Sequence, residues 1–141
     1  MKQSIPKIIF YRVKDNQAKI RFICTKAQEA LNQEKRLLIL VPNPEAGHYI
    51  DTLLWRQPEE DFLPHVFTQS STMEWIAITT QEGANLNQAD LLLNLCSHSV
   101  QTYQPYHEIY ELYDETHPQK LESSKQRLKD YLDKGLFVKE L

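Results

Sequence analysis

The sequence predicts an α/β fold in which helices cover both faces of a central sheet. Segments typical of strands alternate with segments typical of helices along the chain. The segment 37–41, Leu-Leu-Ile-Leu-Val, is continuously apolar, which is typical of a strand buried on both faces. The chain has 141 residues, a length that suits one hydrophobic core, so we expect a single domain over residues 1–141.

The first part of the chain is expected to form a strand, a helix and the buried strand 37–41. Residues 8–11, Ile-Ile-Phe-Tyr, are a short apolar run and predict the first strand. Asp15 and Asn16 can cap a following helix. Between residues 20 and 31, apolar side chains recur at steps of three and four, which predicts the buried stripe of that helix.

A second helix is predicted after the buried strand. Asn43 is a suitable cap, and Pro44 suits the first helical position. Pro58 cannot continue a helix and is expected to end it. Residues 62–65 are then expected to be extended, because a residue before proline avoids the helical conformation.

The second half of the chain predicts three more strands and a closing helix. The apolar segments 75–79, 91–96 and 109–113 are expected to be strands. The helix is expected over residues 118–134, where Gly135 provides a left-handed end.

Charge is distributed unevenly along the chain. The net charge is −3, so the whole molecule is not expected to bind nucleic acid directly through bulk charge. All Lys and Arg residues lie between Lys2 and Arg56 or between Lys120 and Lys139, and residues 57–119 contain none. Any surface that binds an anion is therefore expected to be built from the two ends of the chain.

The sequence lacks the motifs of common catalytic and cofactor sites. It contains no glycine-rich phosphate loop, no metal-binding H-E-x-x-H and no G-x-S-x-G around a nucleophilic serine. Cys96 and His98 could share one face of a strand, although a buried cysteine is the simpler interpretation. His107, Glu108 and Glu111 are interpreted as a solvated polar set, with metal binding as the alternative. No cofactor, no metal ion and no catalytic activity are expected.

The sequence also indicates where the protein resides. No apolar run approaches the roughly 20 residues that span a bilayer, and no signal-peptide pattern follows the basic start. Cys24 and Cys96 are too few for a disulfide framework and are expected to be buried, reduced thiols. These features predict a cytoplasmic protein without membrane contact.

Two groups of residues have the character of partner-binding sites. The first lies between the second helix and the following strand and combines large rigid side chains with prolines, as binding hot spots do. Its members are Trp55, Arg56, Pro58, Phe62 and Pro64. The alternative is that these aromatic side chains only pack the core.

The second group lies on the closing helix. Lys125 and Lys129 are four residues apart and share a face, with Leu128 and Leu132 beside them, while Arg127 lies on a neighbouring face. Such a stripe can bind a short acidic peptide that carries an aromatic ring. The alternative is a solvated helix in which Lys129 pairs with Asp133.

The first group belongs to a longer pattern, Ile50-Asp51-x-x-Leu54-Trp55-x-x-Pro58-x-x-x-Phe62-x-Pro64-His65. This pattern resembles the signature of the DNA polymerase III chi subunit family. The segments Phe10-Tyr11, 35–39, 90–95 and Tyr131-x-x-x-Gly135 agree with the family in order and spacing. The resemblance implies a three-layer Rossmann-like domain with a mostly parallel central sheet, helices on both faces and no nucleotide-binding loop.

The resemblance also implies a function and its residues. Chi proteins are non-catalytic subunits of the clamp loader in DNA replication, and they link it to single-stranded-DNA-binding protein. The resemblance implies that Lys125, Leu128 and Lys129 bind the acidic C-terminal tail of that protein. It implies a second partner, a psi-like subunit or a helicase, at the group of Trp55, Arg56, Pro58, Phe62 and Pro64. The chain departs from better-known members at Leu128, where they have an aromatic residue, and at Lys125, where they have arginine.

Other functions stay open at the level of the sequence. An α/β domain of this size could be a small hydrolase-like enzyme, for which a deep pocket with convergent polar groups would be evidence. The segment from Trp55 to Phe62 could serve another kind of interaction module. The basic ends of the chain could bind single-stranded DNA, although the net acidity argues against this.

Overall fold

The structure is a computed structural model that describes residues 5–56 and 63–141. Its central element is a seven-stranded sheet with the order β3-β4-β2-β5-β6-β1-β7, in which every described strand pair is parallel. The strands are β1 (Lys7–Val13), β2 (Leu37–Leu40), β3 (His65–Phe67), β4 (Ile76–Thr79), β5 (Leu91–Asn94), β6 (Glu108–Asp114) and β7 (Val138–Glu140). The helices are α1 (Asn16–Asn32), α2 (Pro44–Arg56) and α3 (Pro118–Asp133).

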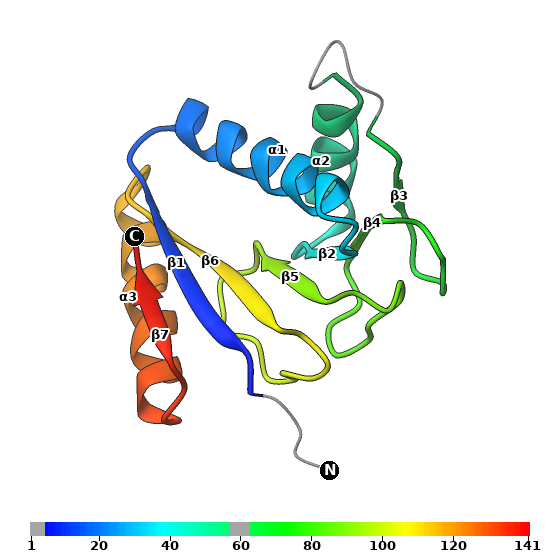
Figure 1. Cartoon of the computed structure of the whole chain (residues 1–141). Helices are drawn as coiled ribbons and strands as arrows, with labels where there is room; N and C mark the ends of the chain where they lie inside the picture. The colour runs from blue at the N-terminus through cyan, green and yellow to red at the C-terminus, as the bar shows by residue number, and fades with distance from the viewer. Residues whose placement is uncertain (1–4, 57–62) are drawn as a thin grey trace.

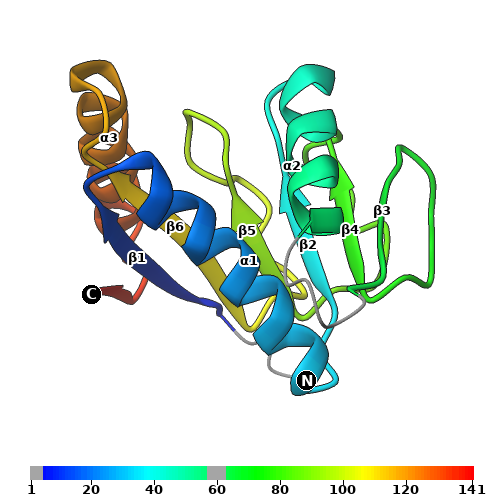
Figure 2. The same cartoon turned by 90° about the horizontal axis from the view of Figure 1, so that it is seen from above.

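The helices cover both faces of the sheet (Figures 1 and 2). α1 and α2 pack on one face through buried residues such as Ile23 and Ile50. α3 packs on the other face, where Tyr131 joins Phe10 and Ile109 in a second core. The prediction of a three-layer, Rossmann-like α/β domain with helices on both faces is confirmed, and the sheet is more uniformly parallel than expected.

The central strands are apolar because they have no solvent-facing side. All four residues of β2, of β4 and of β5 are buried. Successive residues of a strand point to opposite faces, so alternate residues of β2 contribute to the two cores. Leu37 and Ile39 lie in the core under α1 and α2, and Leu38 and Leu40 lie in the other.

Side-chain caps begin α1 and α2 as the sequence predicted. The carboxylate of Asp15 accepts a hydrogen bond from the amide of Ala18 at 2.8 Å. The side-chain oxygen of Asn43 accepts one from the amide of Ala46, also at 2.8 Å. Each cap satisfies an amide that the first turn of a helix cannot pair internally.

The order of the strands differs from their order in the chain. β1 is followed by α1 and then β2, yet β6 and β5 lie between β1 and β2 in the sheet. α1 and α3 follow the neighbouring strands β1 and β6 but lie on opposite faces. Such a change of face opens a crevice beyond the carboxyl ends of the strands.

Two features of the chain differ from the sequence prediction. β7 follows the closing helix and pairs with β1, whereas the sequence predicted no strand there. It has three residues, and none of them is buried, so it lacks the apolar run that identifies the central strands. The extended segment expected at 62–65 leads into β3, which begins at His65, while residues 57–62 lie outside the described part.

Candidate partner-binding surfaces and the central cleft

The end of α2 carries the exposed aromatic side chain that the sequence singled out. Trp55 is 55% exposed, so it is not a core residue. Its ring lies 4.3 Å, centroid to centroid, from the ring of His65 at the start of β3. Arg56 is exposed and Pro64 is half-buried. We call Trp55, Arg56 and Pro64 the Trp55 surface; Pro58 and Phe62 lie outside the described residues.

His65 holds the chain against α2 beneath this surface. It is buried, and its Nδ1 lies 2.6 Å from the backbone oxygen of Leu63. Its Nε2 lies 3.2 Å from the carboxylate of Asp51 and 3.1 Å from the backbone oxygen of the same residue. Both ring nitrogens are therefore engaged, which orients the imidazole that contacts Trp55 and gives the Trp55 surface a rigid support.

The inner face of α3 is polar, which the sequence did not predict. Its buried residues are Ser124, Arg127 and Tyr131, at spacings of three and four. Nε of Arg127 lies 2.9 Å from a carboxylate oxygen of Glu111 in β6, and its Nη2 donates to the backbone oxygen of Leu112 at 2.7 Å. These bonds dock α3 on the sheet and decide which face of the helix meets solvent.

Glu111 is the centre of this buried network. Besides Arg127, it accepts hydrogen bonds from the hydroxyl of Tyr131 at 2.5 Å and from the amide of Asn94 at 2.8 Å. Burial raises the pKa of Glu111, while Arg127 and these donors oppose that rise. The interpretation of Glu111 as part of a solvated set with His107 was wrong, because Glu111 is fully buried.

The outer face of α3 carries the residues expected to bind an acidic tail. Lys125 and Lys129 are exposed, and Leu128 is half-buried between them. Lys129 pairs with Asp133 at 2.7 Å, as the solvated-helix alternative proposed. We call Lys125, Leu128 and Lys129 the α3 surface. Arg127 is not available beside it, because it points into the protein.

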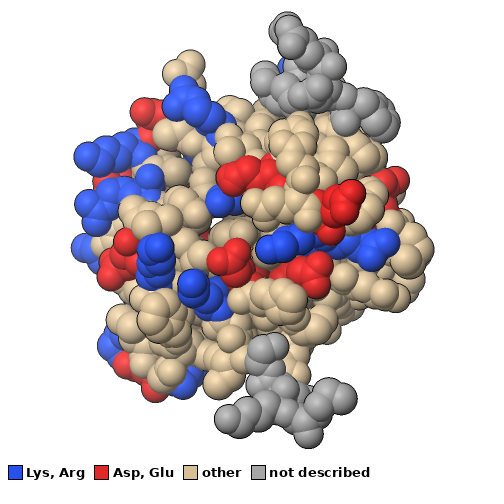
Figure 3. All heavy atoms as spheres, viewed as in Figure 1, with Lys and Arg blue, Asp and Glu red and all other residues tan. Residues whose placement is uncertain are grey.

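Basic side chains gather on one side of the molecule. In Figure 3, most Lys and Arg side chains of the visible face lie over the region of α3, β7, β1 and the start of α1, with acidic side chains between them. The two ends of the chain meet there because β1 lies between β6 and β7 in the sheet. Both ends of the chain thus contribute basic side chains to this region, as an anion-binding surface built from the two ends would require.

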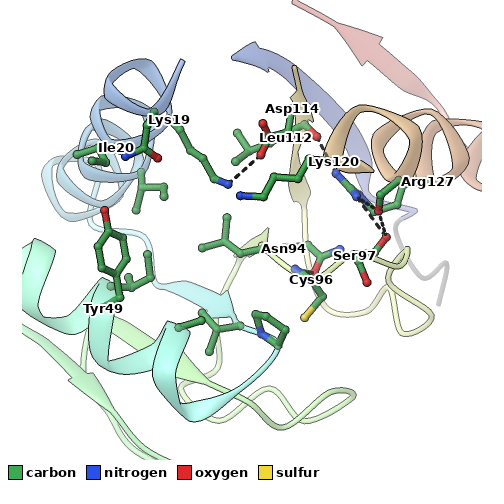
Figure 4. A pocket seen from close by; sticks show the side chains of 18 of the residues that line it. Lys19, Ile20, Tyr49, Asn94, Cys96, Ser97, Leu112, Asp114, Lys120 and Arg127 are labelled. Carbon is green, nitrogen blue, oxygen red and sulfur yellow. Dashed lines mark hydrogen bonds and ion pairs between the residues drawn. The ribbon is translucent and has the colours of Figure 1, made fainter. Parts of the chain in front are cut away.

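A cleft of about 540 Å³ opens at the carboxyl ends of β2, β5 and β6 (Figure 4). Its walls come from the first two turns of α1 and of α2 and from residues 119–127 of α3. Lys19 of α1 donates to the carboxylate of Asp114 at 2.8 Å, and Lys120 of α3 points into the same space. No local pattern in the sequence predicts this cleft, since Lys19 and Lys120 come from opposite ends of the chain.

The cleft lacks the parts of a recognisable hydrolase. Among the described residues that line it, there is no histidine to act as a general base. Burial, with the charges of Glu82 and Glu111, raises the pKa of the Cys96 thiol to about 11, so little thiolate forms near neutral pH. His98 is not its partner, because it is exposed and pairs with Glu82 at 3.0 Å.

Metal-binding groups and membrane-spanning helices also bear on the class of protein. Within residues 5–56 and 63–141, no group of three or more His, Cys, Asp or Glu side chains is placed to hold a metal ion. In the same part of the chain, no helix combines the length and the hydropathy needed to cross a bilayer. Cys96 is buried and Cys24 is half-buried, and both are free thiols.

The turns after the strands carry no glycine-rich loop, and the loop after β2 has prolines at positions 42 and 44. These features define the class as a Rossmann-like α/β domain without the phosphate loop of nucleotide-binding members.

The family model of the DNA polymerase III chi subunit, HolC, matches residues 5–139, and the chain belongs to this family. It is therefore an accessory subunit of DNA polymerase III, in a family of non-catalytic subunits. A search of curated proteins finds no match.

Proposed function

We propose that this subunit links DNA polymerase III to single-stranded-DNA-binding protein through the α3 surface, and to a psi-like subunit or a helicase through the Trp55 surface. The observation that carries the proposal is the separation of the two surfaces. α2 contacts β3 and β4 at one edge of the sheet, whereas α3 contacts β6 and β7 towards the other edge. Two partners can therefore bind one domain without competing for the same residues.

The chemistry of the α3 surface suits the acidic C-terminal tail of single-stranded-DNA-binding protein. Lys125 and Lys129 supply ammonium groups for carboxylates, and the half-buried Leu128 supplies apolar area for a ring. Lysine makes point contacts rather than the planar two-point contact of arginine. We therefore expect an affinity that falls as salt concentration rises.

The chemistry of the Trp55 surface suits a folded protein partner. An exposed tryptophan on a rigid support buries much area at a small cost in side-chain entropy, and arginine is enriched with it at binding hot spots. The contact between Trp55 and His65 restricts the indole before a partner arrives. Pro58 and Phe62, which the family resemblance assigns to the same site, are part of this proposal.

Bridging is effective because it raises local concentration. Once one surface is occupied, binding at the other becomes an event within a tethered assembly. Two weak contacts can then hold the polymerase close to single-stranded DNA that is covered by its binding protein. No DNA contact by this subunit itself is needed, which agrees with its net charge of −3.

The tail site is tested with a fluorescent peptide that copies the C-terminal tail of single-stranded-DNA-binding protein. Fluorescence anisotropy would be measured for the wild type, for Lys129→Glu and for Arg21→Glu at low and moderate salt. Arg21 is the matched control, because it is exposed on α1, on the other face of the sheet. Saturable, salt-sensitive binding that only Lys129→Glu weakens is the expected result.

Two other outcomes of this titration would change the proposal. Equal binding by Lys129→Glu and the wild type would move the tail to another surface. Failure of the wild type to bind the peptide at low salt would contradict tail docking altogether. The second partner is tested separately, by co-elution of a psi-like subunit with the wild type and with Trp55→Ala, and unchanged co-elution of the variant would contradict the assignment of Trp55.

A further inference from the structure

The central cleft joins the two basic ends of the chain and belongs to neither partner surface. Lys19 reaches it from α1, in the N-terminal part of the chain, and Lys120 reaches it from α3, near the C-terminus. Lys125, Leu128, Lys129 and Trp55 do not line it. A role for this cleft would therefore be additional to the docking proposed above.

The ammonium groups in the cleft outnumber the carboxylates available to them. Figure 4 shows the side chains of Lys19 and Lys120 converging in front of Asp114. Asp114 is bonded to Lys19 at 2.8 Å, and Lys120 forms no ion pair with any described residue. The charge of Lys19 is the main cause that lowers the pKa of Lys120; partial desolvation adds to it, and the charge of Asp114 opposes both. The two ammonium groups are therefore held close together beside one carboxylate.

The other cation at the cleft does not change this balance. Arg127 lines its edge but is already paired with the buried Glu111 at 2.9 Å. Lys120 therefore shares the charge of Asp114 with Lys19 and has no carboxylate of its own among the described residues that line the cleft. A single anionic group placed between Lys120 and Lys19 would relieve the repulsion between them.

The walls of the cleft are largely apolar. Ile20 of α1 and Tyr49 of α2 line one side, and Leu112 of β6 lines the opposite side (Figure 4). Tyr49 is 50% exposed, so its ring is accessible from solvent. Binding sites for small molecules combine such walls with a few convergent polar groups, and a volume of about 540 Å³ falls within their usual range.

Backbone amides contribute little to anion binding here. In each helix that begins at the cleft, a cap side chain occupies one amide of the first turn; the caps are Asp15, Asn43 and His117. α2 and α3 also begin with proline, which has no amide hydrogen to donate. A polyphosphate normally needs several free amides at a helix start. The lysine side chains are thus the main anion-binding groups, which favours one anionic group over a chain of phosphates.

We infer that the central cleft binds a small organic anion, whose one carboxylate or phosphate lies between Lys19 and Lys120 and whose apolar or aromatic body lies against Ile20 and Tyr49. Neither the peptide tail nor the second partner is required for this binding. The inference is independent of the proposed docking function, and either can fail without the other.

The test uses phenyl phosphate and 3-phenylpropionate as probes of the two kinds of anion. Each would be titrated into the ¹⁵N-labelled full chain, and amide shifts would be followed by NMR. Saturable shifts are expected at the cleft amides of Asn16, Ser97 and Lys120, with dissociation constants on the order of 1 mM for probes of this size. Lys120→Gln should weaken both probes by about tenfold or more, as the loss of a charged contact does.

Controls separate this site from general charge effects. Lys134→Gln removes the same charge from a residue that follows α3, lies outside the cleft and belongs to neither partner surface, so it should leave both affinities unchanged. Unchanged affinity in Lys120→Gln, or the absence of saturable cleft shifts in the wild type, would overturn the inference. Binding of inorganic phosphate as tight as that of phenyl phosphate would overturn the role of the apolar walls. Binding of only one of the two probes would contradict the claim that the cleft accepts both a carboxylate and a phosphate.

Discussion

Nε of Arg127 lies 2.9 Å from Oε1 of Glu111, and both side chains are almost completely buried. Removing one partner of such a pair leaves an uncompensated charge inside the protein. Arg127→Met should therefore lower the free energy of unfolding by about 3–5 kcal/mol, measured by urea denaturation. Arg127→Met combined with Glu111→Gln should be less destabilised than the single variant, because the charge is removed while the hydrogen bonds to Tyr131 and Asn94 can persist. A double variant that is no more stable than Arg127→Met would contradict this account.

Asp114 should make stability depend on acid pH. Burial disfavours its charged form, but the bonds from Lys19 and Thr116 outweigh burial and lower the pKa of Asp114. Folding lowers this pKa, so the stabilisation is present above the unfolded value, about 3.9, and is lost as pH falls through the folded value. Asp114→Asn should be less stable than the wild type by about 1–3 kcal/mol at neutral pH. The difference between the thermal midpoints of the two proteins should narrow below about pH 4. A constant difference down to pH 2 would contradict the stabilisation by the charged form of Asp114.

Gly47 is expected to be required for close packing between α2 and β3. A methyl group at this position would overlap the ring of Phe67. Alanine favours a helix by about 1 kcal/mol over glycine, but overpacking costs about 1–3 kcal/mol, so Gly47→Ala should be neutral to destabilising. In the background of Phe67→Leu, the same substitution should become stabilising. Thermal unfolding of the four proteins measures this difference, and equal effects in both backgrounds would exclude the proposed overlap.

Asp133 should compete with an acidic tail for Lys129. The two side chains are 2.7 Å apart on the solvent-exposed face of α3. Asp133→Asn would release Lys129 and remove a repelling charge, so the tail peptide should bind about two- to fivefold more tightly at low salt. Glu122→Gln is a control on the same helix, because Glu122 is exposed and makes no ion pair within the described structure. An equal gain from both variants would show a general effect of net charge.

Cys96 should be slow to react in the folded protein. Burial raises its pKa to about 11, and the pKa of Cys24 is also raised by burial. Because the thiolate is the reactive form, a disulfide reagent at pH 8 should modify the native protein far more slowly than the protein in denaturant. Rapid native labelling at Cys96, located by mass spectrometry, would contradict the burial described here.

Local patterns predicted the parts of the fold that local chemistry determines. The apolar runs of β2, β4 and β5 and the caps at Asp15 and Asn43 are readable from a few neighbouring residues, and the structure confirms them. β7 was not predicted, because its stability comes from pairing with β1 rather than from its own composition. A segment of three residues with no buried side chain has no pattern that distinguishes a strand from an irregular end of the chain.

The polar interior and the cleft were beyond local reasoning. Burial of Arg127 depends on Glu111, which lies on a different element, so a spacing rule within α3 could not identify the pair. The spacing of Ser124, Arg127 and Tyr131 is typical of one helix face, but their polar character does not distinguish a buried face from a solvated one. Lys19 and Lys120 meet only because β1 and β6 are neighbours in the sheet. The roles of Trp55, Lys125, Leu128 and Lys129 in partner binding stay predictions.

The placement of β6 and β5 between β1 and β2 has a consequence for synthesis on the ribosome. When α2 has been made, β1 and β2 already exist, but the strands that separate them in the sheet have not yet emerged. The nascent chain must therefore keep β1 and β2 apart, or part them again, until residue 114 has left the exit tunnel. Such distant pairing slows folding and leaves apolar strands unprotected meanwhile. Truncated nascent chains ending before β6 should thus depend on chaperones more than the complete chain does.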